Sequence, residues 1–253
     1  MDHDERLRLA ADLTERLLDR HGAAIVAVGV HGSVARGDDG EESDLDLAVV
    51  TAGPEAAVPD RSLYLPGQGT VVDLGAIDAD AYLEEASSIG PAWPLAADQY
   101  VNHLAIHDPG GYFHKLKHVH EAAVEEAGPE AFAAAAGFDL VRLLSWEATA
   151  RAAELAGDLL TTQVAVKEAA VLAALVVGLT TRTAYRNTSH ALNATAATGA
   201  AGPAFAAAFR RLLDPTADPA VQVLALGRAR DALTALADRE GIPYRASGLD
   251  AFV

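Results

Sequence analysis

The sequence predicts an α+β protein with its strands in the amino-terminal part and a helical carboxy-terminal part. Short β-branched runs recur between residues 23 and 77, separated by turns and charged segments. After Gly128-Pro129 the chain becomes rich in alanine and leucine at helical spacing, and strand signals are scarce. The 253 residues, 51% of them apolar, suit domains of roughly 100–150 residues. We therefore predict two domains, 1–128 and 129–253.

The amino-terminal part is predicted to open with a helix, a buried strand and a tight turn. Leucines recur at helical spacing over residues 5–21, with charged residues between them. Residues 23–30 form a short β-branched run typical of a buried strand. Gly32-Ser33 follows at once and is expected to begin a short helix. Residues 44–50 alternate carboxylate and apolar side chains before becoming fully apolar, which predicts a strand with one wet face at its start.

The next elements are expected to be a loop, a third strand and a run of helices. Residues 54–69 are rich in proline and glycine and predict a connecting loop, with room for a short strand at 62–65. Residues 70–77 predict a strand in which Asp73 is the one charge before Asp78. From Ala79 to Gly111 we expect helix with loop breaks. The later helices are predicted over Glu130–Ala156, Thr162–Thr180, Pro203–Leu213 and Pro219–Glu240.

Composition restricts the partners and the compartment. There are no cysteines, which excludes disulfides and Cys-ligated zinc. The amino terminus lacks the basic start and apolar run of a secretory signal, so we expect a cytoplasmic protein. The most apolar stretch, Val164 to Leu179, is interrupted by Lys167 and Glu168 and is shorter than the ~20 apolar residues of a membrane span.

The formal charge of −17 predicts that neither nucleic acid nor an anionic membrane is the main partner, because both would be repelled. A cationic substrate would be attracted. Three lysines stand against 16 arginines and 36 acids, a composition equally typical of a salt-adapted or high-GC organism. Both explanations of the acidity remain open.

One constellation carries chemistry: a strand, Gly32-Ser33, an Asp44-x-Asp46 pair ten residues later, and Asp73 embedded in a further strand. A glycine and a serine at a helix start present backbone N–H groups and a hydroxyl, which suit phosphate oxygens. Taken singly, the parts have ordinary alternatives: a capped turn, a solvated edge strand and an isolated acid. Their order on consecutive β elements favours a catalytic site.

The three carboxylates predict a magnesium site. Alternate residues of a strand share a face, which would place Asp44 and Asp46 on one side, ~6.5 Å apart along the backbone. Side-by-side carboxylates repel each other unless cations neutralise them, and hard oxygen ligands suit Mg²⁺. Asp73, on a neighbouring strand, would supply a third carboxylate and allow two ions to be bridged.

Other polar residues near the motif are assigned more simply. Arg36, one helical turn after Ser33, would face the same phosphate chain, with an exposed surface arginine as the alternative. His31 is expected to be a turn residue, because magnesium prefers oxygen ligands. The later histidines lack a zinc pattern and are expected at the surface; they are His103, His107, His114, His118 and His120.

These residues resemble the DNA polymerase β superfamily of nucleotidyltransferases, and more closely the kanamycin (aminoglycoside 4′-O-) nucleotidyltransferase family. The matching segments run through nearly the whole chain: Val28–Arg36, Ser43–Asp46, Trp93–Leu95, Asp108–Tyr112, Thr162–Ala165 and Arg239–Gly241. The resemblance implies a mixed sheet with helices followed by a helical bundle, and a homodimer with active sites shared between subunits. It also implies magnesium-dependent transfer of AMP from ATP to an aminoglycoside hydroxyl, releasing pyrophosphate, as in antibiotic resistance.

The resemblance also implies roles for two residues of the helical part. Aligned with the family, Glu147 is the general base and Arg151, four residues later, contacts the nucleotide phosphates. That spacing puts both on one helix face, as it would for an ordinary ion pair. Where the family carries acids one turn before the base, this chain has Arg142, Leu143 and Leu144. An alternative activity is therefore adenylylation of a protein or another small-molecule hydroxyl, as by an antitoxin-like regulator.

Overall fold

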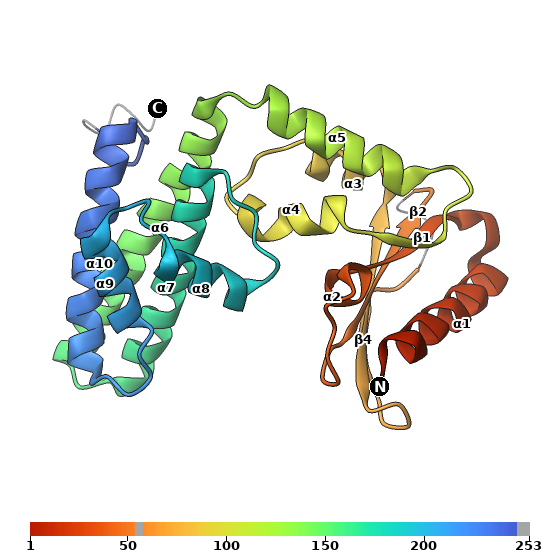
Figure 1. The fold of residues 1–253 in the computed structure, drawn as a ribbon, viewed down its shortest axis with the longest axis horizontal. Coiled ribbons are helices and arrows are strands. Elements are labelled where there is room, and N and C mark those ends of the chain that lie inside the picture. The colour runs from red at the N-terminus through yellow and green to blue at the C-terminus, as the bar shows by residue number, and fades with distance from the viewer. Residues whose placement is uncertain (54–57, 247–253) are drawn as a thin grey trace. The chain divides into compact units, whose positions relative to one another are not determined.

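The computed structural model describes residues 1–53 and 58–246, which form two compact units (Figure 1). The first unit comprises the described residues of 1–88 together with Ala97–Glu126, and the second comprises Ile89–Ala96 together with residues 127–246. The predicted α+β class is confirmed, with a mixed sheet in the first unit and helices in the second. The domain boundary after residue 128 remains a prediction.

The first unit is built on a five-stranded sheet with the strand order β3-β4-β2-β1-β5. Strand β2 pairs with β4 in parallel and with β1 in antiparallel orientation, so the sheet is mixed. Strands β3 and β5 pair antiparallel at the two edges. The strand bounds are β1 Ile25–His31, β2 Leu45–Thr51, β3 Arg61–Leu65, β4 Thr70–Asp78 and β5 Leu104–His107.

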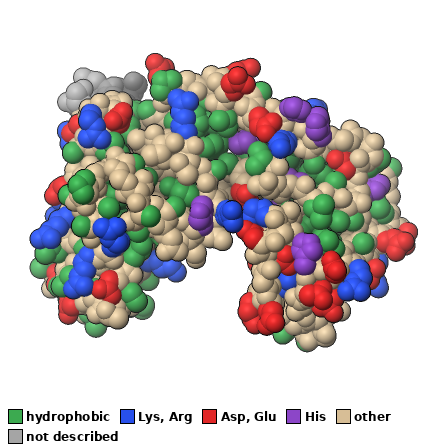
Figure 2. Space-filling model, viewed as in Figure 1, with side chains coloured by type: hydrophobic (Ala, Val, Ile, Leu, Met, Phe, Trp, Pro, Cys, Tyr) green, Lys and Arg blue, Asp and Glu red, His purple; other side chains and the backbone are tan. Residues whose placement is uncertain are grey.

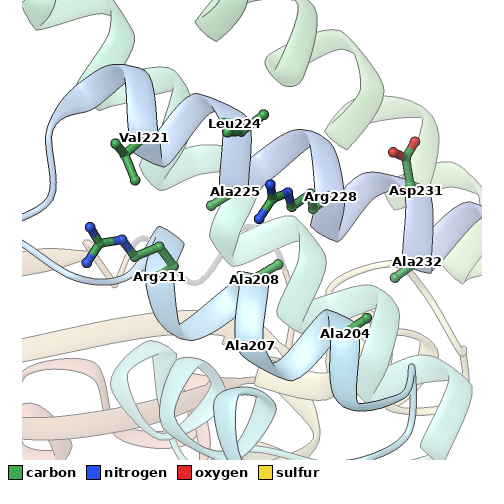
Figure 3. Close-up of a pocket in the computed structure, with 10 residues that line it drawn as sticks. All are labelled: Ala204, Ala207, Ala208, Arg211, Val221, Leu224, Ala225, Arg228, Asp231 and Ala232. Carbon is green, nitrogen blue, oxygen red and sulfur yellow. The ribbon is translucent and has the colours of Figure 1, made fainter.

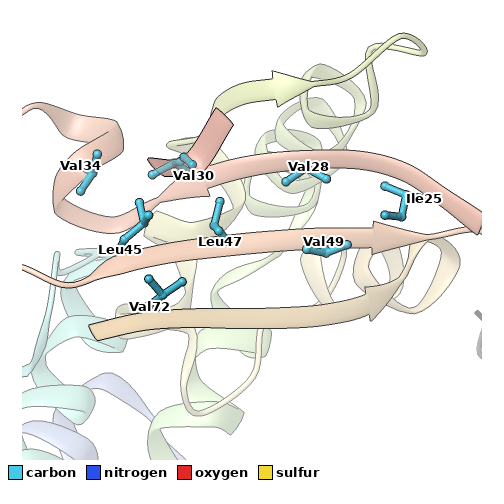
Figure 4. Packing of buried hydrophobic residues seen from close by; sticks show 9 residues of the cluster. Ile25, Val28, Val30, Val34, Leu45, Leu47, Val49 and Val72 are labelled. Atoms are coloured by element: carbon cyan, nitrogen blue, oxygen red, sulfur yellow. The ribbon is translucent and has the colours of Figure 1, made fainter. Parts of the chain in front are cut away.

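Helices cover both faces of this sheet. The bounds are α1 His3–His21, η1 Gly22–Ala24 (a 3₁₀ turn), α2 Gly32–Arg36, α3 Ala79–Ala86 and α5 Tyr112–Glu126, while α4 (Trp93–Val101) has residues in both units. Helix α1 begins with a capping box in which Asp2 and Glu5 bond each other's backbone N–H groups. Alternate strand residues point to one face, where the leucines of α1 pack on Val28, Leu47 and their neighbours. Figure 4 shows the strand residues of this cluster together with Val34 of α2.

The opposite face of the sheet packs against α5. A Cβ at Gly29 would lie 2.7 Å from the Phe113 ring, so the glycine lets α5 lie close to β1. Residues that alternate with the α1-facing ones, including Asp46 on β2, belong to this second face. The second face therefore carries the polar motif.

Two elements differ from the sequence expectation. Residues 104–107, expected in a helical segment, form β5, because pairing with β1 satisfies backbone groups that a four-residue run could not satisfy alone. Helix α8 (Thr188–Ala197) was not expected, and it begins at Asn187, whose side chain accepts from the His190 N–H. The start of the predicted loop, residues 54–57, lies outside the described residues.

The second unit is a helical bundle. Its bounds are α6 Pro129–Leu155, α7 Leu159–Thr181, α8 Thr188–Ala197, α9 Pro203–Leu212 and α10 Pro219–Glu240. Proline stands in the first turn of α6, α9 and α10, where its missing N–H costs nothing. Small residues allow close packing: a Cβ at Gly178 of α7 would lie 2.7 Å from Tyr185. The four predicted carboxy-terminal helices are confirmed.

Helix α7 is longer than the apolar stretch expected from the sequence. Judged by length and composition alone, this helix of 23 residues is long and apolar enough to cross a membrane. That test is also passed by the core helices of bundles, and 67% of its most apolar window is buried inside the structure. Its buried side, which includes Ala165, Ala169 and Leu172, is typical of the central helix of a bundle.

Candidate functional site

Gly32 and Asp46 meet at the end of β1, where the chain turns into α2. Gly32 has φ +70°, and a Cβ at this position would collide with the Asp46 carboxylate. Glycine is therefore required here by its backbone conformation and by the space that Asp46 occupies. Ser33 follows as the second residue of α2, as predicted. The turn thus lies directly against Asp46, the second carboxylate of the motif.

The predicted carboxylates lie on neighbouring strands. Asp46 of β2 is in register with Asp73 of β4 in the parallel pair, so the two residues lie side by side on one face. Asp44 immediately precedes β2 and is exposed, so the expected strand begins one residue later than predicted. Asp73 accepts a hydrogen bond of 2.8 Å from Ser62 of the edge strand β3.

The pKa of Asp46 reflects its burial beside two other carboxylates. Burial, followed by the charges of Asp44 and Asp73, raises the pKa of Asp46 to about 6, against a smaller opposing effect of Arg36. A carboxylate whose charge is disfavoured by two neighbouring acids is a group that a cation would stabilise. Such a raised pKa beside like charges is typical of functional sites.

The donor set of Asp44, Asp46 and Asp73 fits a hard divalent cation, since all three supply carboxylate oxygens and the charges of Asp44 and Asp73 disfavour ionisation of Asp46. In residues 1–53 and 58–246, however, no three or more His, Asp or Glu side chains are gathered closely enough to hold a metal ion. The chemistry of the residues therefore fits a metal better than their present side-chain positions do.

The alternative interpretation of Arg36, an exposed surface arginine, is wrong. Its side chain is 13% exposed and forms ion pairs with Asp98 of α4 and, at 3.3 Å, with Asp38. Nothing in the sequence motif indicated Asp98, which lies 62 residues further along the chain. The guanidinium is thus held beside the motif by carboxylates, and a phosphate group would have to replace one of them.

Tertiary packing covers three histidines more than the sequence indicated: His31, His103 and His120. His31 is in register with Asp46 across β1 and β2, and burial lowers its pKa. The His103 ring stacks on Phe113 at a centroid distance of 4.4 Å, and burial lowers its pKa to about 3. His120 is 3% exposed and bonds the Ala86 carbonyl at 2.9 Å. The expectation of surface positions was wrong for His103 and His120, because tertiary packing covers them.

The second unit contains the other two predicted residues. Glu147 of α6 is only 5% exposed, and its Oε2 lies 3.7 Å from Nη2 of Arg151, one turn later. Both border an open cleft of about 330 Å³ between α6 and α10. Leu143 is buried in the bundle, while Arg142 forms a 3.2 Å ion pair with Asp139. A nearly buried glutamate at a cleft differs from an exposed helix ion pair.

Comparisons with known proteins agree with this geometry. Residues 11–91 match the family model of the nucleotidyltransferase domain. The chain is 32% identical over 116 residues to aminoglycoside nucleotidyltransferase (4′) of Staphylococcus aureus, and equally to that of a Bacillus species. These alignments cover 46% of this chain and 45% of each relative, so less than half of each relative's length is matched.

Structural comparison extends over more of the chain. A nucleotidyltransferase-like protein from Exiguobacterium sibiricum superposes with a TM-score of 0.56 over 92% of this chain and 77% of its own. At 13% identity this likeness supports the fold alone. The mixed sheet, the glycine turn against Asp46 and the matched family model have one common explanation. Residues 11–91 therefore match a nucleotidyltransferase domain, and aminoglycoside nucleotidyltransferases (4′) are among the proteins that the chain resembles.

Proposed function

We propose that this protein transfers AMP from ATP to a hydroxyl of an aminoglycoside-like small molecule and releases pyrophosphate, in a magnesium-dependent reaction. The main support is the contact of Gly32 with Asp46 beside the in-register Asp73, since this pairs a phosphate-binding turn with carboxylates for a cation. The aminoglycoside class comes from the two relatives named above. The net charge of −17 suits a cationic acceptor.

The residues would divide the work on the nucleotide as follows. Gly32, lacking a Cβ, lets the triphosphate approach the backbone, and the Ser33 hydroxyl donates to a phosphate oxygen. Arg36 exchanges one of its carboxylate partners for a phosphate. Asp44, Asp46 and Asp73 would hold magnesium, two ions being expected, which neutralises the phosphates and favours ionisation of the attacking hydroxyl.

The acceptor half of the reaction involves Glu147 and Arg151. Glu147 accepts the proton of the acceptor hydroxyl as its oxygen attacks the α-phosphorus. The bond from that phosphorus to the bridging oxygen of the β-phosphate breaks, and pyrophosphate leaves with the electron pair. Arg151, which is 56% exposed, is free enough to contact a phosphate group.

We further propose a cytoplasmic homodimer that binds neither nucleic acid nor membrane. The support for self-association is a group of exposed leucines around the turn between α6 and α7: Leu155 is 80% exposed and Leu160 is 73% exposed, with Leu159 between them. Contiguous exposed apolar side chains of this kind mark interaction sites in many proteins. The acidity of the chain supports the absence of nucleic-acid and membrane partners.

The test is turnover with ATP, Mg²⁺ and a panel of aminoglycosides, read as pyrophosphate release at low and high salt. We expect release with kanamycin and none with an analogue that lacks the 4′-hydroxyl. The double variant Asp44→Asn/Asp46→Asn should be inactive. The control variant Asp2→Asn changes the N-cap of α1, distant in sequence from the motif, and should retain activity. Turnover in the double variant would contradict the assignment of the carboxylates. Release with no member of the panel would favour the alternative acceptor, a protein or another small-molecule hydroxyl.

A further inference from the structure

Two arginines from different helices lie near the carboxylate of Glu147, and of the two it is Arg151 that lies within ion-pair distance. Its Oε2 is 3.7 Å from Nη2 of Arg151 on α6. Its Oε1 points toward α10, where a Cβ on Gly227 would be 4.0 Å from that oxygen and 4.0 Å from Nη2 of Arg230. Glu147 and Arg230 therefore converge over Gly227, which leaves the space between the two helices open.

Arg230 is held in place by its inner end. Its Nε lies 2.9 Å from Oδ1 of Asp231 and donates to the Gly227 carbonyl at 3.4 Å. Within the described parts of the chain, neither of its Nη atoms has a hydrogen-bond partner. The side chain is 29% exposed. The outer edge of this guanidinium is thus available to the carboxylate that faces it.

The other charged groups around Glu147 do not take this role. Glu154 borders the same cleft but lies seven residues after Glu147 on α6, two helical turns or about 10 Å along the axis. Arg228 lies on the side of α10 that also borders the wider groove with α9, which is lined mainly by alanines (Figure 3). Helix α7, which packs on α6, has its two charged residues Lys167 and Glu168 exposed and outside the cleft.

We propose that Arg230 is a positioning residue for Glu147, orienting Oε1 as Arg151 orients Oε2. This inference rests on the proposed function, in which Glu147 is the general base. A nearly buried carboxylate needs compensating charge to remain ionised, and Arg151 alone faces only one of its oxygens. With Arg151 3.7 Å from Oε2 and Arg230 on the side of Oε1, the two positive charges would favour one orientation of the carboxylate plane, so that a lone pair faces the acceptor hydroxyl.

The experiment measures kcat and KM against pH for Arg230→Ala, Arg230→Lys and a matched control, Arg239→Ala. Arg239 is an exposed arginine of the same helix that pairs with Glu240 and borders neither groove. We expect Arg230→Ala to lower kcat about tenfold at neutral pH and to move the acid limb of the profile up by about one pH unit. KM for ATP should change little. Lysine should restore most of kcat, and Arg239→Ala should behave as the unsubstituted protein.

A second variant separates charge from folding. Gly227→Leu keeps Arg230 but places a side chain between it and Glu147, so it should shift the acid limb in the same direction. An unchanged acid limb in both a folded Arg230→Ala and a folded Gly227→Leu protein overturns the inference.

The variant Glu147→Gln separates the role of Arg230 from the role of Glu147 as general base. If this substitution abolishes turnover while Arg230→Ala leaves kcat and the pH profile intact, the inference fails and the proposed function stands. If Glu147→Gln retains full turnover, the proposed base is wrong, and the role of Arg230 falls with it.

Discussion

At the scale of single residues, Gly32 and Gly37 form a natural pair for testing the turn. Both have φ +70°, so alanine is strained at either position, at about 1 kcal/mol or more. Only Gly32 has a neighbour in the way, because its Cβ would collide with Asp46 whereas Gly37 has open space. We expect Gly37→Ala to lose stability and keep activity, and Gly32→Ala to lose both. Thermal unfolding and pyrophosphate release check this, and equal activity in the two variants would contradict it.

The raised pKa of Asp46 also determines how the stability of the fold should depend on pH. Its folded pKa of about 6 lies above the ordinary value of 3.8, so the folded state holds more protons than the unfolded state between these values. Stability is therefore lost as pH rises through this window. Allowing for partial exposure, Asp46→Asn should be about 1–2 kcal/mol more stable than the unsubstituted protein at pH 7 without metal. The difference should vanish near pH 4.

Denaturant unfolding with a chelator present, at pH 4 and pH 7, measures this difference. Adding Mg²⁺ at pH 7 should stabilise the unsubstituted protein more than Asp46→Asn, because the cation binds the ionised carboxylate. A variant that is less stable than the unsubstituted protein at pH 7 without metal would show that burial and repulsion do not dominate at Asp46.

At the scale of elements, two helix-interior glycines are predicted to respond in opposite directions to alanine. Gly137 of α6 faces the Pro243 carbonyl, a backbone group that a Cβ would collide with and that cannot easily move. Gly227 of α10 has nothing nearer than 4.0 Å. Alanine should therefore destabilise at 137 by about 1–3 kcal/mol, and stabilise at 227 by about 0.5–1 kcal/mol through helix propensity. Chemical denaturation of both variants tests it; a stabilised Gly137→Ala would contradict the close contact.

The elements also show where local sequence is sufficient. The helical spacing of leucines located α1 to within two residues, and long alanine- and leucine-rich runs that begin at a proline located α6 and α10 equally well, because these signals are local to the chain. The four residues of β5 and the ten of α8 are too short to carry such a pattern. Their conformations depend on β1 and on the bundle, respectively, to pair or cover them.

At the scale of the whole molecule, the charge of −17 predicts a response to salt. Figure 2 shows acidic side chains in many places on the visible surface, with Lys and Arg side chains between them. Since salt screens repulsion over about 10 Å at 0.1 M, raising KCl toward 1 M should increase the melting temperature. Sucrose at matched osmolality is the control for excluded-solute effects. A parallel rise in KM for kanamycin would indicate that the acidity also attracts the acceptor, whereas an unchanged KM would favour habitat as its cause.

The sequence by itself determined the order of chemistry-bearing residues and the division into a strand-containing and a helical part. Spacing placed Gly32 and Ser33 in a turn, Asp44 and Asp46 at the start of a strand, and Asp73 within a further strand, because such periodicities are local. Tertiary structure decided which of these residues meet. The parallel register that sets Asp73 beside Asp46, the collision that makes Gly32 obligatory, and Asp98 on Arg36 all join segments distant in the chain. Likewise, Arg230 faces Glu147 only because α10 packs against α6 over Gly227, and no local pattern contains that contact.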